Sequence, residues 1–156
     1  MNQCGHMGDI KSSEERSKNM SAIRSKNTKP EIYVRKLLFA EGYRYRIHSK
    51  TIPGHPDMFL RKYNTAIFIH GCFWHRHNGC KYAYTPKTRV EFWQKKFQNN
   101  LIRDEQVKEA LLSRQIKCLI IWECSIKSVQ KKNGYPERLV QTVNAFFDSD
   151  NLYMEI

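Results

Sequence analysis

The order of apolar and polar positions predicts two helices in the first quarter of the chain. A short amphipathic stretch over residues 12–23 has acidic residues in its first turn, where they oppose the positive end of a helix dipole. A second helix is expected from Thr28, which forms a capping-box pattern with Glu31, and Gly42 ends it. An apolar face at helical spacing runs between these two ends.

Strands are predicted next. Residues 43–48 alternate with a period of two, which is typical of a half-buried strand. Residues 57–60 and 66–69 are short and apolar. Tyr63 and Asn64 lie between them as a tight connection, so a β-hairpin is expected.

The second half of the chain predicts a crossover. Residues 71–86 are an irregular loop, and a long helical pattern follows over residues 88–114. A continuous apolar strand over 116–123 and a last helix over 137–147 complete the order. The fold class is therefore α/β, with a hairpin and a parallel crossover in one mixed central sheet flanked by helices. One domain over residues 12–156 is expected.

Composition narrows the setting. The chain has 156 residues, 40% of them hydrophobic, which suffices for one core. Its longest apolar run, residues 118–122, is too short for a membrane span, and residues 1–11 form an expected disordered tail without a secretory signal. We therefore expect a cytoplasmic protein, for which disulfides are a poor explanation of the 5 cysteines.

Charge indicates a partner. The net charge is +12, and residues 1–50 carry 11 basic and 5 acidic groups. Residues 51–100 carry 8 and 2, whereas residues 101–156 carry 8 and 8. A basic two thirds beside a neutral last third favours a directed positive surface, and nucleic acid is its expected partner. An anionic membrane surface and a merely basic protein are the alternatives.

A cysteine-histidine set predicts a metal site. Cys72, His77 and Cys80 lie close in sequence, and Cys124 follows the buried strand. Three cysteines and one histidine are a common ligand set for structural zinc. An ion would also order a loop that has little regular structure of its own. Free buried thiols are the alternative.

A carboxylate and aromatic residues add candidate chemistry. Asp57 opens a strand whose hairpin partner ends at His70, a placement that many metal-dependent nucleases use. The second carboxylate and the lysine usual on the partner strand are missing, so this pattern alone is weak. Phe73-Trp74 and Phe92-Trp93 stand among basic residues, which suits base stacking, although burial in the core explains such residues equally well.

Taken together, these residues resemble the very-short-patch repair (Vsr-like) endonucleases that nick DNA at T:G mismatches. The resemblance covers nearly the whole chain. It is carried by RSKNM at 16–20, PGHPD at 53–57, IHGCFWH at 69–75, EFW at 91–93 and WEC at 122–124, with Glu31, Lys96, Asn100, Arg103 and Asp104. One more residue separates His77 from Cys80 than in the family pattern, and Gly79 is the expected accommodation.

The resemblance implies a PD-(D/E)xK restriction-endonuclease-like fold with a structural zinc loop. It implies an enzyme that cuts one strand 5′ to the mismatched thymine and so initiates repair. Asp57 would bind catalytic Mg²⁺ together with the Ile69 carbonyl. His75 would be the general base, His70 would assist at the phosphate, and Glu31 would hold metal-bound waters, unless it serves only as a helix cap.

The resemblance also implies roles in DNA binding and in zinc binding. Aromatic residues would wedge into the major groove, one methionine would enter the minor groove, and two polar residues would contact the mismatched pair. The aromatic residues are Phe73, Trp74 and Trp93. The methionine is Met20, and the two polar residues are Lys96 and Asn100. The structural zinc would be bound by Cys72, His77, Cys80 and Cys124.

Two other functions stay open at this point. One is a related nuclease with another DNA target, and the other is a zinc-stabilised DNA-binding module without catalysis. Such a module has no need of Asp57, His70 and His75 around one strand end. We expect a monomer acting near the nucleoid, because a T:G site is asymmetric. The sequence leaves open the bases around the mismatch, the cognate methyltransferase and whether a mismatch-repair protein assists.

Overall fold

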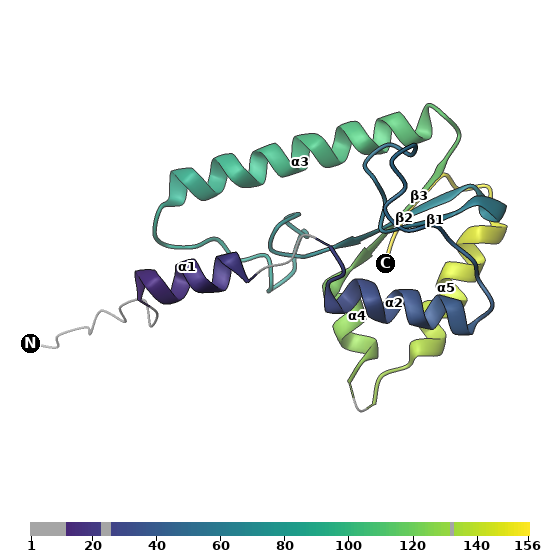
Figure 1. Ribbon diagram of the computed structural model, residues 1–156, viewed down its shortest axis with the longest axis horizontal. Coiled ribbons are helices and arrows are strands. Elements are labelled where there is room, and N and C mark those ends of the chain that lie inside the picture. The colour runs from purple at the N-terminus through teal and green to yellow at the C-terminus, as the bar shows by residue number, and fades with distance from the viewer. Residues whose placement is uncertain (1–11, 23–25, 132) are drawn as a thin grey trace, which may run out of the picture.

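A mixed four-stranded sheet forms the centre of the protein (Figure 1). The computed structural model describes residues 12–22, 26–131 and 133–156, so the expected N-terminal tail lies outside it. The strands are β1 (Met58–Leu60), β2 (Thr65–His70), β3 (Lys117–Trp122) and β4 (Tyr153–Glu155), in the spatial order β1-β2-β3-β4. β1 and β2 are antiparallel, whereas β2, β3 and β4 are parallel. The predicted combination of hairpin and crossover is confirmed.

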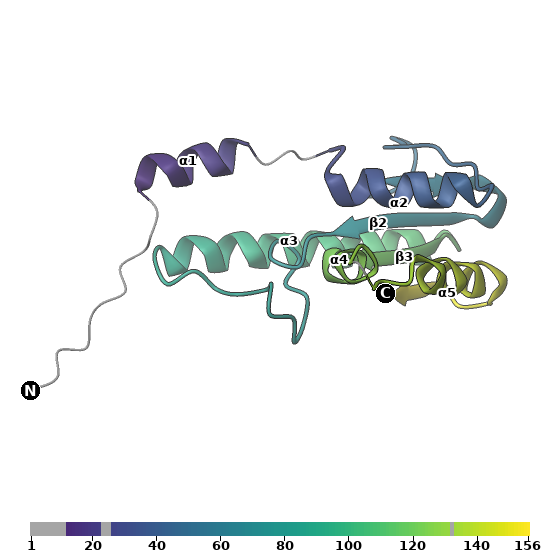
Figure 2. The same cartoon turned by 90° about the horizontal axis from the view of Figure 1, so that it is seen from below.

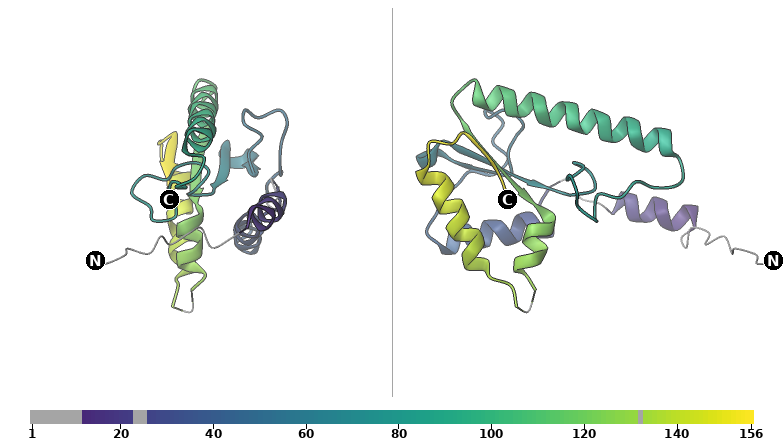
Figure 3. Two further views of the ribbon diagram at one scale, coloured as in Figure 1. Left: turned by 90° about the vertical axis from the view of Figure 1, so that its left-hand side faces the viewer. Right: turned by 180° about the vertical axis from the view of Figure 1, so that it is seen from behind.

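Helices cover both faces of this sheet. α2 (Lys29–Ala40), α4 (Glu123–Val129) and α5 (Pro136–Asp148) lie on one face, and α3 (Val90–Leu112) lies on the other (Figures 1 and 3). α1 (Ser13–Ser21) extends beyond the end of the sheet (Figure 2). None of the helices in the described part of the chain combines the length and apolarity needed to cross a membrane.

The strand period of two divides the core into two clusters. Ile67 and Leu119 point toward α2, α4 and α5, whereas Phe68 and Ile120 point toward α3. Both faces of β2 and β3 are therefore buried, which explains why these strands read as continuous apolar runs rather than as alternating ones. The result is a three-layer α/β arrangement in one domain.

Two expectations differ from the structure. The strand predicted over residues 43–48 is wrong: only Arg46 forms a β-bridge, with Phe59, and the chain then turns at His48, whose φ is +47°. The short helix α4 and the edge strand β4 were not predicted. α4 has 7 residues and β4 has 3. Local periodicity does not identify elements this short.

A buried lysine fastens the sheet to α5. Lys117, at the start of β3, is 9% exposed, and its Nζ donates to the carbonyls of Phe146 at 2.6 Å, Phe147 at 3.2 Å and Ser149 at 2.6 Å. These carbonyls lie at the C-terminal end of α5, where the helix dipole favours a cation. Lys117 therefore acts as a C-terminal cap supplied by a different element of the fold.

We expect Lys117→Met to lower the free energy of unfolding by about 2–3 kcal/mol, because buried carbonyls lose a charged donor. Lys62→Met is the matched control, since Lys62 is exposed, and it should change stability by less than about 0.5 kcal/mol. Urea denaturation of both variants measures the difference. Equal effects would contradict the capping role.

Candidate active site and metal centre

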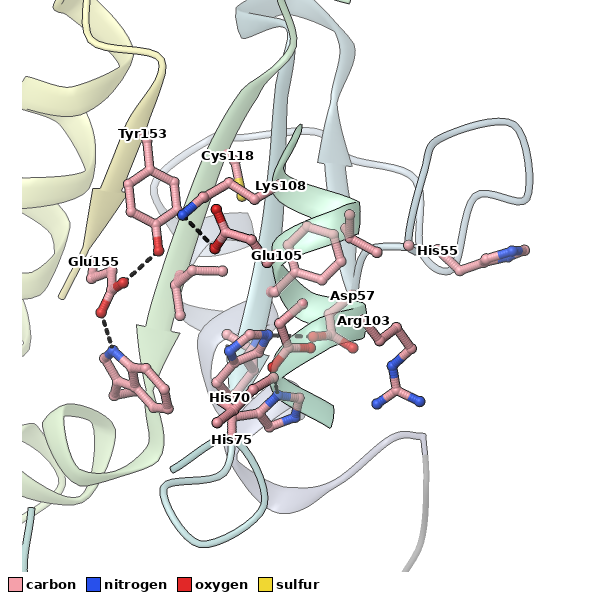
Figure 4. A pocket seen from close by; sticks show the side chains of 18 of the residues that line it. His55, Asp57, His70, His75, Arg103, Glu105, Lys108, Cys118, Tyr153 and Glu155 are labelled. Carbon is pink, nitrogen blue, oxygen red and sulfur yellow. Dashed lines mark hydrogen bonds and ion pairs between the residues drawn. The ribbon is translucent and has the colours of Figure 1, made fainter. Parts of the chain in front are cut away.

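A cleft of about 550 Å³ opens where β2 and β3 end, between α3 and the N-terminal end of α2. Asp57, His70 and His75 line it (Figure 4). Asp104 is also part of its lining. Carboxyl ends of parallel strands are the usual site of binding in α/β folds, because the chain leaves the sheet there in loops that carry polar residues. All four predicted catalytic residues, Glu31 included, thus line one cavity.

The side chain of Asp57 is held by the backbone N–H of Ile69, which lies just beyond the residues of β2 that pair with β1. Met58 is the last β1 residue paired with β2, opposite Ile67, so Ile69 has no ladder partner on that side. Its N–H instead donates to Oδ2 of Asp57 at 2.7 Å. Burial raises the pKa of Asp57 to about 6, the Ile69 N–H opposes this shift, and the negative charge of Glu31 adds to it. A cation bound beside Asp57 would stabilise the charged form of this buried carboxylate.

The two histidines form a stacked pair. Their ring centroids are 3.8 Å apart with planes 13° from parallel, because the His75 N–H donates to the Gly71 carbonyl and the turn folds His75 over His70. Burial lowers the pKa of His70 to about 3, and His75 contributes in the same direction. His70 is therefore neutral at physiological pH and can act only as an uncharged hydrogen-bonding group.

Asp104 on α3 orients His75. Its Oδ2 lies 2.5 Å from Nδ1 of His75, so Nδ1 carries the proton and Nε2 presents its lone pair elsewhere. This is the arrangement that a general base requires. Asp104 belongs to the residues that carry the family resemblance, but sequence reasoning assigned it no role. The signal available was its spacing of four from Asn100, on the same face of a long helix.

His70, His75 and Asp104 also come within 4.8 Å of one another, a distance that would suit an ion. The ring planes argue against one. A histidine nitrogen directs its lone pair in the plane of the ring, and two nearly parallel stacked rings cannot both aim at one ion. The trio is therefore suited to moving a proton rather than to binding a metal.

Glu31 takes part in the cap of α2 and also lies in the cleft. Its Oε1 accepts from the Thr28 hydroxyl at 2.9 Å and its Oε2 from the Asn27 N–H at 2.9 Å, as part of the α2 cap. It is nevertheless only 4% exposed and lines the cleft beside Asp57. Capping and a role in the cleft are compatible in this geometry.

The predicted zinc ligands lie together. The donor atoms of Cys72, His77, Cys80 and Cys124 are all within 4.8 Å of one another, with His77 Nδ1 3.7 Å from Cys72 Sγ and 3.3 Å from Cys124 Sγ. A tetrahedral zinc with bonds of about 2.1–2.3 Å needs donor atoms roughly 3.5–3.8 Å apart, so the set fits. Gly79, directly before Cys80, has a φ of +69°, a left-handed conformation that glycine adopts without strain.

The candidate wedge residues form an aromatic cluster between the loop and α3. Phe73 lies 5.1 Å from Trp74 and 5.4 Å from Trp93 between ring centroids. Lys96 Nζ lies 5.4 Å from the Trp74 ring, and Asn100 donates to the Trp74 carbonyl at 2.9 Å. All five residues are thus brought together, with the three aromatic rings half-buried.

These recognition candidates border the cleft. Trp74, Lys96 and Asn100 line a second hollow of about 440 Å³, which shares Glu31 and His75 with the first. The sixth candidate, Met20, lies on α1 and is 39% exposed. It does not line either hollow.

Comparison with known proteins agrees with this geometry. Residues 8–81 match the family model described as DNA mismatch endonuclease Vsr. A type II nicking enzyme of Neisseria meningitidis, V.NmeAIP, is 43% identical over 88% of this chain and 97% of its own length. V.XorIIP of Xanthomonas oryzae, also a type II nicking enzyme, is 40% identical over 79% and 90%. The DNA mismatch endonuclease Vsr of Escherichia coli is 38% identical over 80% of each chain.

The raised pKa of Asp57 predicts a stability difference for Asp57→Asn without divalent cations. An unfolded Asp titrates near 3.9, so between about pH 4 and 6 the folded protein keeps a proton that the unfolded chain has lost. Stability therefore falls as the pH rises through this window, and the variant lacks that fall. The variant should equal the wild type at pH 4 and exceed it by up to about 2 kcal/mol at pH 8.

Urea denaturation across this range, in magnesium-free buffer without a chelator, measures the effect. The chelator is omitted because it would also strip a structural metal. Parallel stability profiles for the two proteins would contradict the burial of an ionisable Asp57.

Proposed function

Because the chain belongs to the Vsr family of DNA mismatch endonucleases, we propose that it nicks one strand of duplex DNA 5′ to the thymine of a T:G mismatch and so initiates very-short-patch repair. The observation that carries the proposal is the meeting of Asp57 with the His70, His75 and Asp104 trio in one cleft. A DNA-binding module without catalysis has no use for a buried carboxylate beside an oriented imidazole. We propose that the enzyme acts as a monomer.

Mg²⁺ is the proposed cofactor of the cleft. Asp57 has one carboxylate oxygen bonded to the Ile69 N–H, and its second oxygen, together with the Ile69 carbonyl, would hold the ion. Carboxylate and carbonyl oxygens are the ligands that this hard cation prefers. When bound, Mg²⁺ would polarise the phosphodiester and lower the pKa of water. Glu31, which lines the cleft with Asp57, would hold a water molecule there through its fourth lone pair, since the other three accept from Asn27, Thr28 and Arg35.

His75 is the proposed general base. With Nδ1 protonated and bonded to Asp104, its Nε2 takes the proton from the attacking water. Asp104 stabilises the imidazolium that results. His70, neutral at working pH, would donate a hydrogen bond to the phosphate without adding a positive charge that would repel the protonated His75.

The aromatic cluster is the proposed basis of mismatch selection. Unstacking a base step costs a few kcal/mol, and less where a T:G wobble has already disturbed the stack. Phe73, Trp74 and Trp93 are the wedge candidates, and Lys96 and Asn100 stand beside Trp74 to contact the mismatched pair. Met20, on α1, is the proposed minor-groove contact. Phosphate contacts from the basic part of the chain would supply binding that is independent of sequence.

Zinc is the proposed occupant of the Cys72, His77, Cys80 and Cys124 set. Four protein donors leave no open coordination position, so the ion would be structural. Cys124 lies in the first turn of α4, and the other three donors lie in the loop after β2. The ion would therefore tie the loop that carries His75 to the carboxyl end of β3.

The second candidate is a nuclease with a different DNA target. It is favoured by the relatives named type II nicking enzymes. A nicking assay distinguishes the two candidates. We would use a duplex library with a central T:G pair and randomised flanks, beside a T:A library of the same design, each with and without Mg²⁺, and map the nick by sequencing.

Cleavage 5′ to the thymine of T:G duplexes only, in some set of flanks, is the expected result. Equal cleavage of T:A duplexes would favour the second candidate. Binding of DNA without cleavage under any condition would favour the non-catalytic module.

We expect Asp104→Asn to slow single-turnover nicking by roughly 10- to 1000-fold, since the base keeps its place but loses the partner that fixes its tautomer. Affinity for T:G DNA should change less than about twofold, because Asp104 contacts His75 and not the aromatic cluster. Asp148→Asn, at the exposed end of α5, is the control. Nicking by the Asp104 variant at the control's rate would remove Asp104 from the reaction.

Cys124→Ala should purify with little zinc and unfold at a lower temperature, because a closed zinc site contributes directly to folding. Cys118→Ala is the matched control: Cys118 is buried in the core and lies outside the cluster. Elemental analysis should give about one zinc per chain for the control. The same zinc content in both variants would contradict the assignment.

A further inference from the structure

A partly buried arginine stands between the cap of α2 and the segment that carries Asp57. Arg35 lies one turn after Glu31 on α2, and its side chain is only 11% exposed. Its Nη1 donates to Asn27 Oδ1 at 2.6 Å, and its Nη2 to Glu31 Oε2 at 3.1 Å. Nη2 also lies 3.2 Å from Nε2 of His48. One guanidinium thus joins three side chains from two separate segments.

The His48 end of this chain of bonds leads to Asp57. The His48 N–H donates to the carbonyl of Pro56 at 3.1 Å, and Pro56 directly precedes Asp57. Two residues earlier, Arg46 exchanges both backbone hydrogen bonds with Phe59, at 2.8 and 3.0 Å. The segment that carries His48 is therefore fixed to the segment that carries Asp57, and Arg35 fixes it in turn to Glu31.

The geometry also determines the form of His48. An arginine nitrogen can only donate, so Nε2 of His48 must accept, and the ring is neutral with its proton on Nδ1. Desolvation lowers the pKa of His48, and the charge of Arg35 acts in the same direction. His48 sits at φ +47°, a conformation that a residue with a side chain rarely adopts. Held in this way, His48 lines the cleft together with Glu31 and Asp57.

The cap of α2 does not need Arg35. Thr28 and the Asn27 N–H already occupy both oxygens of Glu31, as an N-terminal cap requires. Within the described residues the Nε of Arg35 is buried without a hydrogen-bond partner, which costs stability. A buried charged group retained at such a cost is poorly explained by folding alone, since an apolar side chain would often serve as well.

We propose that Arg35 and His48 form a positioning clamp that fixes the Glu31 carboxylate relative to Asp57, so that both face one side of the cleft. The proposal rests on the proposed nuclease function, because it assigns the two carboxylates to the same reaction. Arg35 is also a cation beside Glu31, and its charge lowers the pKa of Asp57, which opposes the rise caused by burial and by Glu31. Neither residue touches the scissile bond; both act through Glu31 and the Asp57 segment.

Four variants test the clamp. Arg35→Met keeps an unbranched apolar stem and removes the charge, and Arg35→Lys keeps the charge but not the bridge between Glu31 and His48. His48→Leu removes the acceptor, whereas His48→Gln restores one with its amide oxygen. Arg44→Met is the matched control, because Arg44 is exposed and its hydrogen bonds in the described part of the chain go to the carbonyls of Phe39 and Tyr43, away from the cleft.

We expect both Arg35 variants and His48→Leu to lower the single-turnover rate at saturating DNA by roughly 10- to 100-fold, because a misplacement of about 1 Å is enough for such a loss. His48→Gln should recover most of the rate that His48→Leu loses. The dissociation constant for T:G DNA without divalent metal should stay within about twofold of wild type for all four. If the variants lost activity only because they are less stable, the loss of rate would follow the melting temperature and would be equal for His48→Gln and His48→Leu. That result would overturn the proposal.

Two measurements that do not use nicking separate this proposal from the proposed function. Nitrogen NMR of the histidine rings should show His48 with Nδ1 protonated in the wild type and in Arg44→Met, and a tautomer mixture in Arg35→Met. Binding of Mn²⁺, followed by its electron paramagnetic resonance signal, should weaken at least about fivefold in Arg35→Lys, which keeps the positive charge near the carboxylates and loses the bridge. An unchanged tautomer together with unchanged Mn²⁺ affinity would overturn the clamp even if the enzyme nicks T:G DNA as proposed. Both changes in a protein that cuts no DNA would leave the clamp standing and refute the nuclease function.

Discussion

The parallel pairing of β2 with β3 is the constraint on which the rest of the structure depends. Its register places His70 opposite Trp122. Two residues beyond each of these positions stand Cys72 and Cys124, so the same register that ends the sheet at the cleft also brings the metal donors together. A slip of one residue would move every side chain of a strand to the opposite face. The candidate active site and the candidate zinc site are therefore consequences of one ladder of backbone hydrogen bonds.

Burial shapes the chemistry at the end of that ladder. The same desolvation that raises the pKa of Asp57 lowers the pKa of His70, because in each case the charged form is disfavoured. The site therefore holds a carboxylate that gains from a cation and an imidazole that stays neutral. Perturbed groups of this kind cost folding free energy and are typical of functional sites. Elsewhere the structure contains buried charge with complete compensation, as at Lys117.

The long helix α3 connects the proposed recognition residues with the proposed general base. Trp93, Asn100 and Asp104 come from this one helix and contact, respectively, the aromatic ring of Phe73, the backbone of Trp74 and the imidazole of His75. One rigid element thus holds three consecutive loop residues, so a displacement of the proposed wedge would also move the proposed base. This gives a physical route by which DNA that accepts the wedge would also complete the catalytic geometry.

The sequence by itself determined the elements that have a local signature. Periodicity identified the hairpin, the long helix and the buried strand β3, and residue type and spacing predicted a metal site at Cys72, His77, Cys80 and Cys124, whereas the role proposed for Asp57 came from the family resemblance. Only the tertiary structure decided the pairing of Asp104 with His75 and of Arg35 with His48, since these partners are 29 and 13 residues apart. Such contacts depend on how separate elements pack against one another, and the periodicity of a single segment does not predict that packing. The short elements α4 and β4 form for the same reason: the sheet and its register stabilise them, not their own propensity.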